Sequence, residues 1–152
     1  MPDNLNILDG SQQGALVLTS GTVTITDNAT TTIPFASESY DRGNWHDTDV
    51  SLNTRLTVPA GFGKIRLAAQ IGFSSAAGFG SITLEFTKNG STSYDGLATF
   101  AYEEPNVSIA QLMSPVLEVV EGDFFEFDVT LGVFGANKTA DNNLTWFNAI
   151  GI

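Results

Sequence analysis

The chain has 152 residues, 42% of them hydrophobic, and six Lys plus Arg against seventeen Asp plus Glu give a net charge of −11. A chain of this length can bury one complete core, so one domain is expected. The negative charge repels nucleic acid and anionic membrane surfaces. There is no cysteine, which excludes disulfides, thiol chemistry and Cys-ligated zinc.

No stretch reaches the ~20 apolar residues of a membrane helix. The N-terminus carries acids and lacks the apolar run of a signal peptide. We therefore expect a protein made in the cytoplasm, with neither nucleic acid nor membrane as a partner.

The first 29 residues contain two β-prone runs, 15–19 and 22–26, separated by Ser20-Gly21. They predict an extended arm or a hairpin. Residues 30–36 form the next strand candidate, and Pro34 inside it indicates an edge position. Domain boundaries are accordingly expected at 1–29 for the arm and 30–152 for the folded domain.

Residues 53–73 read as strand, turn, strand, because apolar residues alternate on both sides of Pro59–Gly63. Ser81–Lys88 alternates in the same way and ends at Asn89-Gly90, the strongest hairpin signal in the chain. After Glu121-Gly122-Asp123 an apolar face recurs at every second position. Its members are Phe125, Phe127, Val129, Leu131 and Val133.

Further strands are expected at 97–102, 107–113, 116–120 and 144–152, and no segment has a helical period. About eight to ten short strands separated by Gly, Asn and Pro turns are typical of an all-β sandwich, jelly roll or barrel. Strand spacing alone does not choose among these three.

Five segments, in this order, resemble the C1q/TNF-like jelly-roll family and especially its phage and bacterial members. They are Ile33–Gly43 with its Tyr-Asp-Arg-Gly, Thr54–Gly61 ending in Val-Pro-Ala-Gly, Ile82–Gly90 ending in Lys-Asn-Gly, Leu117–Asp123 ending in Gly-Asp, and Trp146–Ile152. Two departures are Ala149, where Gly is common, and Phe62-Gly63, in place of Gly-x-Tyr. The resemblance implies a two-sheet antiparallel jelly-roll sandwich over residues 30–152 that forms a homotrimer.

In this family the first and last strands lie in the sheet that faces the threefold axis. The resemblance therefore implies that five residues make the trimer contact: Phe35, Trp146, Phe147, Ile150 and Ile152. Adjacent strand residues point to opposite faces, so the ring of either Trp146 or Phe147 should enter the sandwich while the other faces outward. A monomer whose rings are covered by the N-terminal arm is the competing interpretation.

No catalytic constellation is evident, and we expect no enzyme. His46 is the only histidine and stands in a polar loop, so its replacement by Ala is expected to leave stability nearly unchanged. Asp41, Asp47 and Asp49 offer oxygen ligands that suit calcium, which some C1q-like trimers bind. A solvated loop is the simpler interpretation, and no other cofactor is expected.

A compact head behind a short Thr-rich arm resembles a phage capsid decoration or cement protein on the capsid surface of the virion. The arm would attach to the major capsid protein, with Leu16, Leu18, Val23 and Ile25 as contacts. One alternative is the receptor-binding tip of a tail fibre or baseplate, with loops 102–107 and 135–143 holding a host surface glycan. A calcium-dependent lectin-like module is the other.

Overall fold

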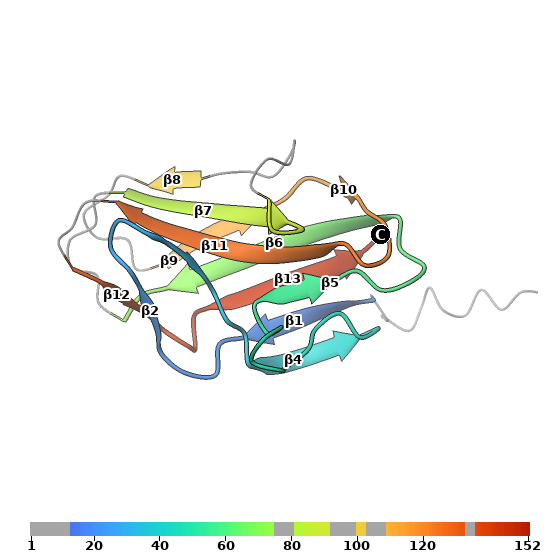
Figure 1. The fold of residues 1–152 in the computed structure, drawn as a ribbon, viewed down its shortest axis with the longest axis horizontal. Coiled ribbons are helices and arrows are strands. Elements are labelled where there is room, and N and C mark those ends of the chain that lie inside the picture. Colours follow the sequence, from blue (N-terminus) through green and yellow to red (C-terminus); the bar gives the residue numbers. More distant parts are fainter. Residues whose placement is uncertain (1–12, 75–80, 92–99, 103–108, 133–135) are drawn as a thin grey trace, which may run out of the picture.

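Two antiparallel sheets face each other in the computed structural model, which describes residues 13–74, 81–91, 100–102, 109–132 and 136–152 (Figure 1). No helix within these ranges is long and apolar enough to cross a membrane. The strands are β1 Gly14–Leu18, β2 Val23–Ile25, β3 Thr30–Thr32, β4 Ser37–Arg42, β5 Arg55–Thr57, β6 Lys64–Gly72, β7 Ser81–Lys88, β8 Phe100–Tyr102, β9 Ile109–Met113, β10 Leu117–Glu118, β11 Phe124–Gly132, β12 Lys138–Ala140 and β13 Trp146–Gly151.

Sheet A runs in the order β10-β6-β13-β1-β4, and β9 also pairs with β6. Sheet C runs β3-β11-β7-β8, with β5 also on β11, and β2 pairs with β12 in a small sheet B. The first and last strands are thus neighbours, and every pairing between named strands is antiparallel. This arrangement confirms the predicted all-β jelly-roll sandwich.

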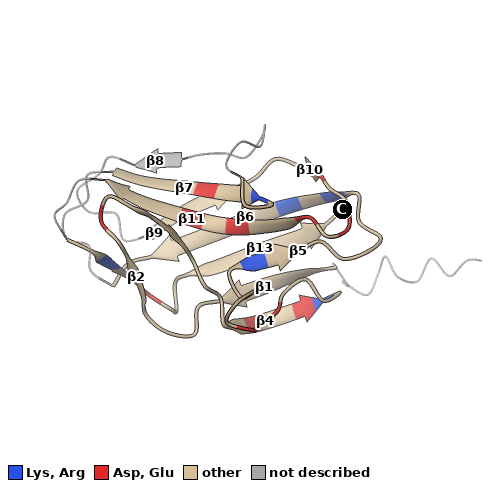
Figure 2. Ribbon diagram, viewed as in Figure 1, with Lys and Arg blue, Asp and Glu red and all other residues tan. Residues whose placement is uncertain are grey.

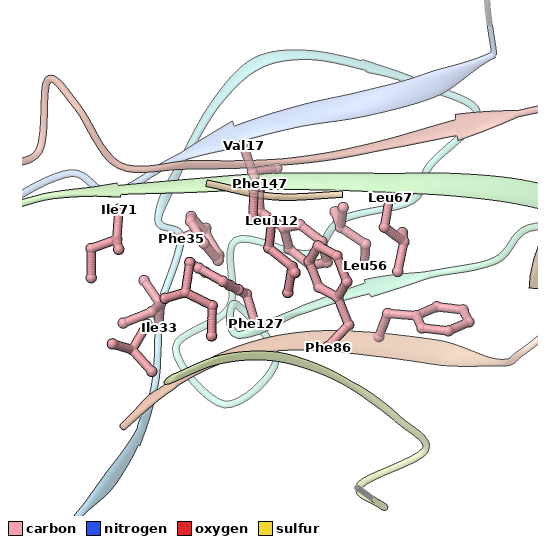
Figure 3. Packing of buried hydrophobic residues seen from close by; sticks show 14 of the residues in the cluster. Val17, Ile33, Phe35, Leu56, Leu67, Ile71, Phe86, Leu112, Phe127 and Phe147 are labelled. Carbon is pink, nitrogen blue, oxygen red and sulfur yellow. The ribbon is translucent and has the colours of Figure 1, made fainter. Parts of the chain in front are cut away.

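The core lies between sheets A and C, as the alternating strands predict. Phe147 on β13 lies at its centre, with ring centroids 5.5 Å from Phe86, 5.7 Å from Phe35 and 6.3 Å from Phe127 (Figure 3). Phe86 comes from β7 and Phe127 from β11, so this one side chain joins the two sheets. All four rings are fully buried.

The N-terminal segment differs from its prediction, because its described part is not a free arm. β1 pairs with β13 on one side and with β4 on the other, and Ala15 and Val17 are buried in the core. β2 adds Ile25, which is also fully buried. The expected division at residue 29 therefore cuts through the sandwich. Docking β1 buries apolar area and pairs backbone groups that a free arm would leave to water.

Several predicted features fall outside the described residues: Val133, the starts of the strands expected at 97 and 107, and loop residues 103–107. β3 is an edge strand, as Pro34 indicated, although the strand ends before that proline.

Two turn motifs that are far apart in sequence meet in space. Lys88 Nζ lies 2.7 Å from Asp123 Oδ2, and Asn89 Nδ2 donates to Asp123 Oδ1 at 2.9 Å. The backbone N–H of Val120 donates to the same carboxylate, while Asn89 Oδ1 accepts from Phe124 N–H. Burial alone would raise the pKa of Asp123, but the hydrogen bonds from Lys88, Val120 and Asn89 outweigh it and lower that pKa.

Replacing Asp123 with Asn should therefore lower the free energy of unfolding by about 1–3 kcal/mol at pH 7, since a nearly buried ammonium loses its partner. A carboxyl with a lowered native pKa stabilises the fold above its unfolded-state pKa. That contribution is lost as pH falls through the native value. The difference between wild type and variant in urea unfolding should hence shrink at pH 3. The exposed neighbour Glu121→Gln is the control, and an equal difference at both pH values would contradict the network's role.

Candidate functional site

The outer face of sheet A is formed by the side chains of β9, β6, β13, β1 and β4 that point away from the core; it is called the sheet A face below. Across the strands, Trp146 lies between Gln70 and Leu18, and Asn148 lies between Ala68 and Leu16. Leu16, Leu18, Ala68, Trp146 and Asn148 line a shallow hollow of about 270 Å³. The centre of the face is therefore largely apolar.

Amide side chains on this face donate hydrogen bonds within the chain. Asn148 Nδ2 donates to the carbonyl of Ala15 at 2.8 Å and to the Tyr40 hydroxyl at 3.0 Å. Gln111 Nε2 donates to Gln70 Oε1 at 2.6 Å, and Gln70 Nε2 donates to the Leu144 carbonyl at 2.8 Å. Such groups can be covered by another surface without leaving these donors unpaired.

Apolar side chains on the same face stay uncovered in the single chain. Met113, opposite Ala68, is 67% exposed, and Ile109, opposite Gly72, is 43% exposed. The sequence prediction missed Ala68, Met113 and Asn148. Their alternation with buried neighbours on β6, β9 and β13 could have indicated that these three residues point outward. That alternation does not indicate which strands lie side by side.

Three of the five predicted trimer-contact residues are available to a partner. Trp146 and Ile150 lie on the sheet A face, and Ile152 is 64% exposed just beyond β13. Phe35 and Phe147 are fully buried in the core, so their prediction as trimer contacts is wrong. Their rings pack against each other between the sheets, and the strand alternation that turns Trp146 outward turns Phe147 inward.

The predicted capsid contacts separate into three environments. Leu16 and Leu18 lie on the sheet A face, at the hollow beside Trp146. Val23 is half-buried on β2. Ile25 is fully buried, so its prediction as an external contact is wrong, because its side chain is part of the core.

The three aspartates proposed for calcium each organise their own loop. Asp41 accepts the backbone N–H of Trp45 at 2.9 Å and of His46 at 3.0 Å. Asp47 Oδ1 accepts the N–H of Asp49. The hydroxyl and the N–H of Ser51 both donate to Asp49, and these bonds lower the pKa of its carboxyl.

These bonds are those of loop-forming carboxylates rather than of a metal site. Within the described ranges, no group of three or more His, Asp or Glu side chains is placed to hold a metal ion. The three aspartates therefore hold the loop together through hydrogen bonds, and calcium ligation by them stays a prediction.

Sheet C presents a different outer face, where Glu85 on β7 lies directly opposite Asp128 on β11. Burial raises the pKa of Asp128, and repulsion from Glu126 adds to it against a hydrogen bond from Thr32. Burial and then repulsion from Asp128 raise the pKa of Glu85. Like charges directly opposite across strands are unfavourable, so this face is a poor surface for packing against a second acidic chain.

His46 is buried, contrary to the solvated loop that the sequence indicated. Its side chain has no exposed surface, and Nδ1 lies 2.9 Å from Glu38 Oε1. Nε2 is 3.4 Å from the carbonyl of Asn53, and the residue forms an isolated bridge to Leu56. The imidazole thus connects the loop to Glu38 of β4 and to the Asn53 carbonyl just before β5. The expectation that His46→Ala leaves stability nearly unchanged does not fit this burial.

We predict that His46→Ala lowers the free energy of unfolding by about 1–3 kcal/mol, because Glu38 and the Asn53 carbonyl lose a partner and a buried space opens. Urea unfolding followed by tryptophan fluorescence would measure it, since Trp45 lies next to the substitution. The exposed loop variant Thr48→Ala provides the control. A change in His46→Ala no larger than in the control would restore the original expectation.

The likeness of this chain to known proteins lies in its fold. No family model matches the chain, and no curated protein sequence matches it. Among solved structures, the globular domain of zebrafish complement 1qA protein aligns with a TM-score of 0.67 at 14% identity, over 93% of this chain and 97% of that chain. Murine APRIL aligns with 0.62 at 12% identity, over 93% and 99%. Eiger TNF from S. frugiperda aligns with 0.55 at 14%, over 93% and 92%. At these identities the likeness shows a TNF/C1q-like jelly-roll fold.

Proposed function

We propose that this chain is a non-catalytic structural protein that forms a homotrimer through the sheet A face. One observation carries the proposal: apolar side chains of that face remain partly or largely exposed in the single chain, whereas its amide side chains donate hydrogen bonds within the chain. Covering such a face removes apolar area from water without stranding those polar groups. The C1q/TNF-like resemblance supports the same assembly, because it implies that this sheet faces a threefold axis.

The composition of the face also favours a protein interface. Trp146 and Met113 are of the residue types enriched at interfaces, and the flanking leucines extend the apolar patch across β1. Exposed apolar patches of this kind mark association sites in soluble proteins. In a threefold ring, the face of one subunit packs against a different surface of the next, and the rotation closes after three copies.

Replacing Met113 with Glu should convert trimer to monomer, because a carboxylate would have to be desolvated within the interface. Val50→Glu is the matched control: Val50 is 87% exposed and lies in the turn before β5, outside the strands of sheet A. Sedimentation equilibrium of both variants gives the masses. Near-UV circular dichroism confirms that each is folded.

A trimeric wild type and control beside a monomeric Met113→Glu is the expected result. A monomeric wild type would refute the assembly, and a trimeric Met113→Glu would move the interface away from this face.

The specific role that we propose is a capsid decoration protein, located on the capsid surface of a tailed-phage virion and attached to the major capsid protein. Its support is the resemblance of Tyr40-Asp-Arg-Gly43 and the other four segments to phage-type members of the family. Of the residues expected to contact the capsid protein, Leu16 and Leu18 lie on the sheet A face, which we assign to the trimer interface, and Ile25 is in the core. The attachment then falls to Val23 and to residues 1–12, which lie outside the described residues.

A truncated chain starting at Gln13 keeps β1 intact and should still form trimers, yet bind capsids far more weakly than the full chain, since three weak arms act together. Co-sedimentation with capsids that lack this protein measures the difference. Equal binding by both chains would show that residues 13–152, and not residues 1–12, contact the capsid. Binding to host cells and to no capsid would favour the receptor-binding tip that recognises a surface glycan.

A further inference from the structure

A second hollow lies at the outer edge of sheet C, away from the sheet A face. It has a volume of about 210 Å³ and is lined by Asn44, Trp45, His46, Asp47, Leu52, Arg55 and Thr57. Its walls are fixed, because the Trp45 carbonyl accepts the N–H of Thr57 at 2.7 Å and His46 is buried. The hollow is therefore a built feature of the loop before β5 rather than a gap between mobile side chains.

Arg55 is the cationic side chain of this hollow. Its guanidinium carbon lies 4.7 Å from the centroid of the Phe124 ring, which holds the group in place by a cation–π contact. Its Nε is buried and has no hydrogen-bond partner. A buried charged donor without an acceptor is costly in a folded protein, and none of the described residues supplies an acceptor to this nitrogen.

The neighbouring acids do not supply that acceptor. Glu126 lies opposite Arg55 across β5 and β11, but no ion pair joins them, and Glu126 Oε1 accepts the hydroxyl of Thr54 at 2.6 Å. Asp47 lines the hollow, but its Oδ1 is engaged by the N–H of Asp49. Arg55 is thus left with its aromatic contact in a chain where acids outnumber bases seventeen to six.

We propose that this hollow binds a small oxyanion, such as sulfate, phosphate or a carboxylate group. The planar guanidinium fork matches two oxygens of such a group, and Thr57 and Asn44 bring further donor groups to the lining. The volume equals that of about seven water molecules in the liquid, at ~30 Å³ each, which accommodates a tetrahedral anion.

The test is a titration of the full-length protein with sodium sulfate, followed by the NMR signals of the Arg55 Nε–H and of the Asn44 and Asp47 amides. Sodium chloride at equal ionic strength separates binding from general screening. Wild type should give saturable shifts with sulfate only. Arg55→Lys, which keeps the charge but loses the fork, should bind about tenfold more weakly, and Arg55→Gln should show no saturation.

Lys138→Gln is the control, because it removes a positive charge from β12, which belongs neither to sheet A nor to the lining of the hollow; its affinity should equal that of wild type. Linear shifts in wild type, equal shifts with chloride, or saturation that survives Arg55→Gln would each overturn the proposal. If Arg55→Gln fails to fold without its Phe124 contact, the other two titrations test the proposal. Saturable shifts in wild type together with weaker binding by Arg55→Lys support it, and equal binding by these two proteins contradicts it. Phosphate and acetate titrations then identify which oxyanion binds most tightly.

Discussion

The burial of Phe147 between the two sheets determines most of what this molecule presents to its surroundings. Its ring stacks on Phe86 of the opposite sheet at 5.5 Å, while the backbone of β13 pairs with β1 and β6. Since strand side chains alternate, seating Phe147 in the core turns Trp146 and Asn148 outward. The same constraint passes across the ladder to β1 and β6, so the apolar hollow of the sheet A face is a direct consequence of core packing.

Charge distinguishes the two outer faces of the sandwich. Figure 2 shows acidic residues within β7 and β11 of sheet C, beside Arg55 on β5. In sheet A the charges lie away from the hollow, with basic residues at the beginning of β6 and acidic residues on β4. The carboxyls of Glu85 and Asp128 already repel each other within one chain. Bringing two acidic faces together would add repulsion between subunits, and the uncharged centre of sheet A avoids it. Electrostatics and apolar burial thus favour the same surface for self-association.

The loop around Trp45 and His46 connects stability with the candidate anion site. Asp41 orders the loop by accepting two backbone N–H groups, and the buried imidazole ties it to β4. That fixed loop forms a wall beside Arg55, whose position depends on Phe124. A residue pattern that looked like a solvated polar loop is therefore a packed element, and its carboxylates accept backbone hydrogen bonds.

By itself, the sequence determined the local features. The alternation of Ile65, Leu67 and Ala69 predicted a long half-buried strand, Asn89-Gly90 predicted a turn, and the order of motifs predicted a jelly roll. The strand and the turn depend on neighbours within a few residues, where period and turn chemistry are decisive. The jelly roll was instead implied by the family resemblance of five segments between residues 33 and 152. The tertiary structure alone decided that β1 is an inner strand, that Phe35 and Phe147 are core residues, and that His46 is buried. It also decided that Lys88 meets Asp123. Those outcomes depend on which distant strands and loops become neighbours, and the balance between burial and solvation that selects the partners is set by the whole fold.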